Sequence, residues 1–335
     1  MNQPALTEPF EIGGVRIANR VLLAPLAGVG NWFVRLQARR HGAGMGVSEM
    51  ISSFAISQGN ERTLGEMLTI HPDEHPVSIQ LFGPEPEVML GAARTAAEAG
   101  ADLIDLNMGC PVPKVCKTGA GAALLRDPDR AVALARAAIE GSGLPVTVKL
   151  RSGLGPGDRS GFDLALRLVD EAGVAGIGFH PRPAAAHHSG SPDYELAREL
   201  AGAVDVPVII SGGLRSADAA RHAYEKSGAD AVMIARGGLG SPWIFEELAG
   251  RRTGAPTRDE ILSELRWVLD RGEEHWGTRR ASRNLRKFYP WYLEQLGLSG
   301  TEADSYQRAD SVDEVREMLS GLGAQPLRIA VSGPV

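Results

Sequence analysis

Leu103-Ile104-Asp105-Leu106-Asn107 is a short, mostly apolar run that continues directly into Met108-Gly109-Cys110-Pro111. Short apolar runs that stop at turn-forming residues are typical of strands in a buried parallel sheet. We therefore predict a strand that brings Asn107 and Cys110 to its carboxyl end.

Seven similar runs recur along the first three quarters of the chain, at the spacing of a β/α unit. They are Val21–Pro25, Gly46–Glu49, Pro76–Leu81, Val146–Leu150, Gly176–His180, Val206–Ile210 and Ala231–Ala235. Helical patterns lie between them at Glu85–Ala99, Asp129–Glu140, Asp163–Ala172, Pro192–Leu200 and Ser216–Ser227. This alternation predicts an α/β fold, a (β/α)8 TIM barrel, with a doubly wound sheet as the alternative.

The pattern changes after Gly250. Arg251-Arg252-Thr253-Gly254-Ala255-Pro256 has the composition of a linker, and the patterns that follow are helical only, at Asp259–Trp276, Ser282–Leu296 and Val312–Leu319. We expect residues 1–250 to form the barrel and residues 251–335 a small all-helical domain.

Composition excludes several classes of protein. The 335 residues are 43% hydrophobic and 23% charged, which is typical of a globular chain. Two cysteines cannot build a disulfide framework or an iron–sulfur cluster, and we expect no metal. No apolar run could span a bilayer and the N-terminus lacks signal-peptide features, so we expect a cytoplasmic protein without a membrane segment. The net charge of −6 argues against general polyanion binding but leaves a local basic patch open.

Ligands of such barrels bind at the carboxyl ends of the strands, an opening that we call the mouth. Five predicted strand ends have polar or glycine residues there: Asn107 with Cys110, Lys149 with Arg151, His180, Ser211-Gly212-Gly213, and Ala235-Arg236. The glycines, followed by a short helix near residues 242–248, are typical of a phosphate site. Cys110 or His180 alone could equally be core residues, and Lys149 part of an ion pair. Their convergence on one opening favours a ligand site.

Several of these segments resemble one known family. They are Ala24-Pro25-Leu26-Ala27-Gly28, Ser48-Glu49-Met50, Ser78-Ile79-Gln80-Leu81, Asn107-Met108-Gly109-Cys110-Pro111 with Lys114-Val115, Val148-Lys149-Leu150-Arg151, and Pro242-Trp243-Ile244-Phe245. In this order they are similar to the flavin-dependent tRNA-dihydrouridine synthases, and most of all to the bacterial B-type. The Asn-Met-Gly-Cys-Pro segment is the most specific of them.

The resemblance implies FMN at the mouth and NADPH as the reductant. It places the flavin ring near Pro25, Leu26, Gln80, Lys149 and His180, and the phosphate near Ser211, Gly212, Gly213, Ala235 and Arg236. It also implies hydride transfer from flavin N5 to C6 of a uracil in tRNA.

The acceptor carbon C5 then needs a proton. A thiol with a pKa near 8.5 is mostly protonated at neutral pH, so we assign the proton to Cys110. Asn107 and Arg151 would bind the uracil edges. Lys149 would stabilise negative charge on the flavin.

A basic segment in the predicted helical domain suits a tRNA partner. Residues 279–287 contain no acid, and four aromatic residues follow: Phe288, Tyr289, Trp291 and Tyr292. The run from Arg286 to Tyr292 corresponds to a segment of the family's tRNA-binding domain, which implies that Arg286 and Lys287 contact tRNA. The alternative is a solvated helix whose aromatic rings pack inward.

Four positions depart from the family pattern: Gly30-Asn31, His180-Pro181-Arg182-Pro183, His187-His188 and Ser211-Gly212-Gly213. They leave two alternatives open. One is a flavin barrel that reduces a small molecule, similar to dihydroorotate dehydrogenases or old yellow enzymes. The other is a non-catalytic RNA-binding protein. We expect a monomer.

Overall fold

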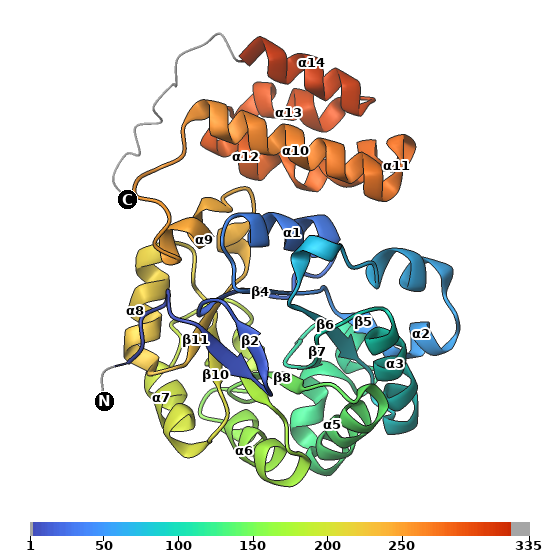
Figure 1. Ribbon diagram of the computed structural model, residues 1–335, viewed down its shortest axis with the longest axis vertical. Helices are drawn as coiled ribbons and strands as arrows, with labels where there is room; N and C mark the ends of the chain where they lie inside the picture. The colour runs from blue at the N-terminus through green and yellow to red at the C-terminus, as the bar shows by residue number, and fades with distance from the viewer. Residues whose placement is uncertain (1–2, 323–335) are drawn as a thin grey trace. The chain divides into compact units, whose positions relative to one another are not determined.

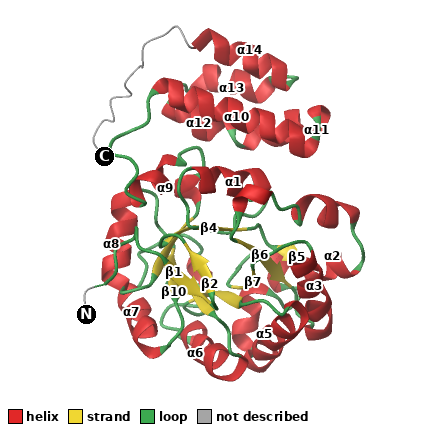
Figure 2. Ribbon diagram, in the orientation of Figure 1, coloured by secondary structure: helices red, strands yellow, loops and turns green. Residues whose placement is uncertain are grey.

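Eight parallel strands form a closed barrel in the computed structural model, which describes residues 3–322 (Figures 1 and 2). In chain order they are β3 (Val21–Leu23), β4 (Met45–Val47), β6 (Val77–Phe82), β7 (Leu103–Met108), β8 (Val146–Arg151), β9 (Gly176–His180), β10 (Val208–Ser211) and β11 (Ala231–Ile234). The barrel closes because β3 pairs with both β4 and β11, and β4 also pairs with β6. The short β5 (Ile51–Ser52) adds to β6. The predicted TIM barrel is confirmed.

Helices connect the strands around the outside (Figure 2). They are α1 (Trp32–Arg40), α2 (Ser53–Ser57), α3 (Pro86–Glu98), α4 (Pro113–Cys116), α5 (Pro128–Ser142), α6 (Ser160–Arg167), α7 (Tyr194–Ala203), α8 (Ala217–Ser227) and α9 (Trp243–Leu248). Local sequence sets their ends. The side chain of Asp127 accepts from the backbone N–H of Arg130 at the start of α5, and Gly143 ends that helix at φ +64°.

A hairpin closes the amino end of the barrel. Its antiparallel strands β1 (Phe10–Ile12) and β2 (Val15–Ile17) were not predicted. Ile12 and Ile17 are fully buried and share a core cluster with Met45, Leu103 and Ala231, the first residues of β4, β7 and β11. The hydrophobic plug at this end leaves the mouth, at the opposite end, as the open face of the barrel.

A buried ion pair holds one mouth loop. Arg35 of α1 and Glu74 are 1% and 0% exposed, and the Arg35 Nε lies 2.6 Å from a carboxylate oxygen of Glu74. Arg35 also donates to the carbonyl oxygens of Gly30, 3.1 Å away, and Thr69, 2.7 Å away. The guanidinium therefore fixes the loop that follows β3.

The chain divides into two compact units. Among the described residues, one contains 3–238 and 244–252, and the other contains 239–243 and 253–322. The described part of the second unit is helical: α10 (Arg258–Trp276), α11 (Thr278–Asn284), α12 (Tyr289–Gln295), α13 (Gly300–Arg308) and α14 (Val312–Leu322). The single helix predicted at Ser282–Leu296 is in fact interrupted by a 3-10 turn at Leu285–Lys287, and α12 starts at Tyr289 with Pro290 in its first turn.

Within residues 3–322, no helix combines the length and the apolar character needed to cross a bilayer.

Candidate active site

The strand register brings most of the predicted barrel residues to the mouth. Asn107 of β7 pairs with Lys149 of β8, and Arg151 pairs with His180 of β9. Ser211 ends β10, with Gly212 and Gly213 directly after it. Pro25 and Leu26 follow β3, and Ala235 and Arg236 follow β11, which is the neighbouring strand. Gln80 lies inside β6 and is fully buried.

A chain of hydrogen bonds connects β6, β7 and the Cys110 loop. Gln80 Nε2 donates to Asp105 Oδ2 at 2.6 Å, and Asn107 Nδ2 donates to Gln80 Oε1 at 3.0 Å. Asn107 Oδ1 then accepts from the backbone N–H of Cys110 at 3.0 Å. Thr147 Oγ1 donates to the other oxygen of Asp105, also at 2.6 Å. Asp105 and Thr147 were not predicted as site residues.

The thiol of Cys110 stays protonated at neutral pH. Burial raises its pKa above the usual value, which outweighs the lowering effects of the Val112 backbone, Arg151 and Lys149. The second cysteine is close by, because Cys116 Sγ donates to the Cys110 carbonyl oxygen at 3.3 Å. Cys110 is thus available as an acid.

Positively charged side chains gather at the mouth near Cys110, beginning with Lys149 and Arg151 on the neighbouring strand β8. Burial, with Arg151 nearby, lowers the pKa of Lys149 to about 8, and its Nζ donates to Ser211 Oγ at 3.2 Å. Burial, with Arg182 nearby, lowers the pKa of Arg151 to about 10. Burial also holds the pKa of His180 far below its usual range, and the cations Lys149, Arg151 and Arg182 add to this effect. Such a concentration of cations favours an anionic ligand.

Two glycines at the end of β10 leave bare backbone beside a guanidinium. Gly212 and Gly213 have φ values of +102° and +83°. A Cβ on Gly212 would lie 2.2 Å from His180 Nε2, and one on Gly213 would lie 3.3 Å from Arg182 Nη2. Arg182 Nη1 is in turn 3.2 Å from His180 Nε2. Accessible backbone next to a buried arginine fits a phosphate group. Arg182 was not predicted as a site residue; it was named only within His180-Pro181-Arg182-Pro183, a segment that departs from the family pattern.

Arg151 has a partner within the protein. Its Nη1 donates to the carbonyl oxygen of His187 at 2.6 Å. His187 is the one non-glycine residue with a positive φ, +48°, among the described residues. The β9–α7 loop therefore holds the guanidinium that was predicted to bind a uracil edge.

The two predicted tRNA contacts in the helical unit differ in their surroundings. Arg286 is half-buried, and its Nη2 donates to the Ala309 carbonyl oxygen at 2.9 Å. Lys287 is exposed. Phe288, Tyr289 and Tyr292 are at most 2% exposed, so the alternative of aromatic rings that pack inward is right for these three.

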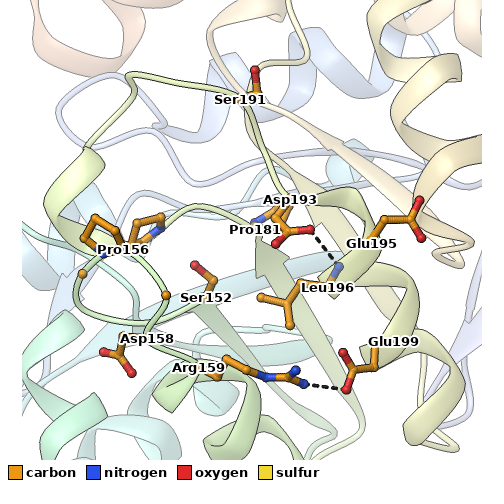
Figure 3. Close-up of a pocket in the computed structure, with 13 residues that line it drawn as sticks. Ser152, Pro156, Asp158, Arg159, Pro181, Ser191, Asp193, Glu195, Leu196 and Glu199 are labelled. Atoms are coloured by element: carbon orange, nitrogen blue, oxygen red, sulfur yellow. Dashed lines mark hydrogen bonds and ion pairs between the residues drawn. The ribbon is translucent and has the colours of Figure 1, made fainter.

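A cavity of about 660 Å³ lies beside the mouth, between the β8–α6 loop and the start of α7 (Figure 3). Ser152 and Pro181, the residues after Arg151 and His180, line it. The other polar lining is mainly acidic: Asp158, Asp193, Glu195 and Glu199, with Arg159 bound to Glu199 at 2.5 Å. This cavity suits an anion poorly, in contrast to the cationic side of the mouth.

Comparison with known proteins identifies the family. The family model for dihydrouridine synthases matches residues 22–320. The chain belongs to the dihydrouridine synthase family. It is therefore an enzyme, and its family is one of flavin-dependent oxidoreductases.

Curated members of the dihydrouridine synthase family match almost the whole chain. The tRNA-dihydrouridine synthase B of Xanthomonas axonopodis pv. citri is 35% identical over 310 residues, which cover 91% of this chain and 92% of that protein. The enzyme of the same name from Pseudomonas aeruginosa is 36% identical, with coverage of 85% and 87%. That from Vibrio cholerae is 32% identical, with coverage of 93% and 98%.

Solved structures share the barrel at much lower identity. An old yellow enzyme homologue from Zymomonas mobilis has a TM-score of 0.57 and 14% identity, covering 77% of this chain and 96% of its own. A 2-naphthoyl-CoA reductase complex has a TM-score of 0.59 and 13% identity, with coverage of 74% and 52%. These similarities concern the fold alone.

Proposed function

We propose that this protein reduces uridines in tRNA to 5,6-dihydrouridine, with FMN as its flavin and NADPH as the reductant. Family membership supports the reaction. The observation that carries the mechanism is the protonated thiol of Cys110, whose backbone is held by Asn107, the residue that pairs with Lys149 on the neighbouring strand.

The residues at the mouth fit FMN. Gly212 and Gly213, with Ser211, Ala235, Arg236 and the newly found Arg182, would hold its phosphate. Pro25, Leu26, Gln80, Lys149 and His180 would hold the ring. When bound, FMN would supply the hydride for C6 of the uracil.

Each side chain then has a defined task at the reacting base. Cys110 holds a proton that it gives to C5, because burial keeps the thiol from ionising at neutral pH. Asn107 would bind one edge of the uracil. Arg151 would bind another after exchanging its bond to the His187 carbonyl for one to the base. Lys149 has a pKa of about 8, so it is mostly charged at neutral pH and stabilises negative charge at the mouth.

The target base lies within folded tRNA, so it must be extruded into the mouth. Arg279, Arg283 and Lys287 are exposed on the helical unit and would bind phosphates there. Arg286 would act indirectly, because its guanidinium holds the end of α13.

An anaerobic mixing experiment tests the proposal. Protein reduced by NADPH is mixed with unmodified tRNA, and the flavin absorbance and nucleoside composition are followed together. We expect flavin reoxidation at the rate at which dihydrouridine forms. Reduction by NADPH with no response to tRNA would contradict the proposal and favour a small-molecule substrate.

Two variants locate the proton donor. Cys110→Ala should keep its flavin and its reduction by NADPH but be reoxidised by tRNA about a hundredfold more slowly, since one general acid contributes about 10²–10⁴-fold. Cys116→Ala is the matched control and should behave like the wild type. Loss of flavin from Cys110→Ala alone would show that Cys110 has a structural role.

A further inference from the structure

Asp105 is a buried carboxyl group that takes no part in the mechanism described above. It lies in the middle of β7, is 2% exposed, and is two residues below Asn107 on the same face of the strand. The register aligns Asp105 with Gln80 of β6 and Thr147 of β8. Burying an ionised carboxylate in the interior of a barrel is unfavourable unless hydrogen bonds or opposite charges compensate for the lost hydration.

The hydrogen bonds of Asp105 have a direction. An ionised carboxylate only accepts, so the Gln80 side chain must turn its Nε2 toward it. Gln80 Oε1 therefore faces Asn107, and Asn107 donates a hydrogen bond to it from Nδ2. Asn107 Oδ1 is then free to accept from the backbone N–H groups of Cys110 and Gly109, at 3.0 and 3.3 Å. One carboxylate thus fixes the orientation of two amides and the backbone of the reactive cysteine.

The opposite orientation would break this arrangement. If Gln80 turned its Oε1 toward position 105, its Nε2 would face Asn107, which would have to turn its own oxygen downward. Its Nδ2 would then face the N–H of Cys110, and two donors would oppose each other. A neutral amide at position 105 permits both orientations, whereas a carboxylate permits one.

We propose that Asp105 is a positioning residue that acts through Gln80 and Asn107 to hold Cys110 in the geometry for proton transfer. The inference rests on the proposed function only for the consequence, the rate of proton transfer to uracil. The mechanical part, that Asp105 restrains Cys110, is independent of any substrate.

Three variants of the flavin-loaded protein test the proposal. Asp105→Leu removes the acceptor and puts a somewhat larger, branched apolar side chain in its place. Asp105→Asn keeps an acceptor but loses the fixed orientation. Ser78→Ala is the control, because Ser78 is fully buried on the strand of Gln80, one layer below it, and its hydroxyl has no hydrogen-bond partner. Circular dichroism and flavin content verify that each variant is folded.

The first readout is the alkylation rate of Cys110 by iodoacetamide, measured by mass spectrometry of tryptic peptides. Lys114 lies between the two cysteines, so they fall in different peptides. We expect Cys110 to react about tenfold faster in Asp105→Leu and several-fold faster in Asp105→Asn, because a hydrogen bond that restrains the backbone is lost. Ser78→Ala should react at the wild-type rate.

The second readout is flavin kinetics. Reoxidation by tRNA should slow about tenfold in Asp105→Leu, and less in Asp105→Asn, while reduction by NADPH changes by less than about twofold. A purely structural effect would impair both half-reactions together. Wild-type alkylation and reoxidation rates in Asp105→Asn would overturn the proposal, even if Asp105→Leu does not fold. If the wild type itself fails to respond to tRNA, the proposed function fails and the alkylation rates alone decide the role of Asp105.

Discussion

Replacing Asp105 by Asn should change how the stability of the protein depends on pH. Burial raises the pKa of Asp105 to about 6, whereas the unfolded chain should keep the usual value near 3.9. As the pH rises from 4 to 6, the unfolded state therefore loses this proton before the native state does. The native state binds more protons in that range, so the contribution of Asp105 to stability decreases with rising pH.

The difference of about 2 pKa units corresponds to about 3 kcal/mol, because one unit is worth about 1.4 kcal/mol. The loss of stability due to Asp105 is complete only at pH values above its native pKa. About half of the loss, roughly 1.4 kcal/mol, develops between pH 5 and pH 7.5. Asn has no proton to lose. Asp105→Asn should therefore gain about 1.4 kcal/mol relative to the wild type over this range.

Urea denaturation of both proteins at pH 5 and pH 7.5, followed by circular dichroism, measures the effect. Groups that titrate alike in the two proteins cancel in the difference. The upper limit of pH 7.5 keeps Lys149 largely charged, since its pKa is about 8. Ser78→Ala should differ from the wild type by the same amount at both pH values. If the difference in unfolding free energy between Asp105→Asn and the wild type is also the same at both pH values, the reasoning is refuted.

Four further substitutions test other parts of the structure. Gly212→Ala should lower the flavin content of the purified protein about tenfold or more, because φ is +102° there and the new Cβ would lie 2.2 Å from His180 Nε2; full occupancy measured by absorbance would contradict the phosphate site. Arg35→Met should cost about 3–5 kcal/mol and lower the melting temperature by about 10 °C, since it leaves Glu74 buried without a cation. The double variant Arg35→Met/Glu74→Leu should regain most of that loss in thermal denaturation. If its loss of stability is instead the sum of the losses of the two single variants, this explanation of the ion pair is wrong. Lys287→Ala should reduce the slope of log Kd for tRNA against log salt by about one; an unchanged slope would exclude Lys287 from the RNA-binding surface.

Much of the barrel could be predicted because its signals are local. Apolar runs alternate with helical patterns, and each of the eight predicted strands has a counterpart in the structure, with β9 matching residue for residue at Gly176–His180. Residues after strand ends meet at one mouth in any parallel barrel, so Asn107, Lys149 and His180 could be assigned to one site without knowledge of their contacts.

The missing parts depend on contacts between distant residues. The role of Asp105 follows from its alignment with Gln80, 25 residues earlier, and this alignment is a property of the sheet. Arg286 belongs to a basic run, but the run does not reveal that this guanidinium reaches the Ala309 carbonyl. Arg35 is likewise a charged helix residue, which is normally exposed, and only the position of Glu74 explains its burial.

The acidic cavity beside the mouth has a consequence for how a polyanion approaches the barrel. Its carboxylates lie on the β8–α6 loop and at the start of α7, while Arg182 and Arg236 lie toward the ends of β9 and β11. The barrel face thus has a negative and a positive sector, and the resulting field exerts a torque on a charged backbone. A nucleic acid strand is turned away from the first sector and toward the second before any base contact forms. The field thus favours one binding orientation at long range, and this preference weakens as salt shortens the reach of the field.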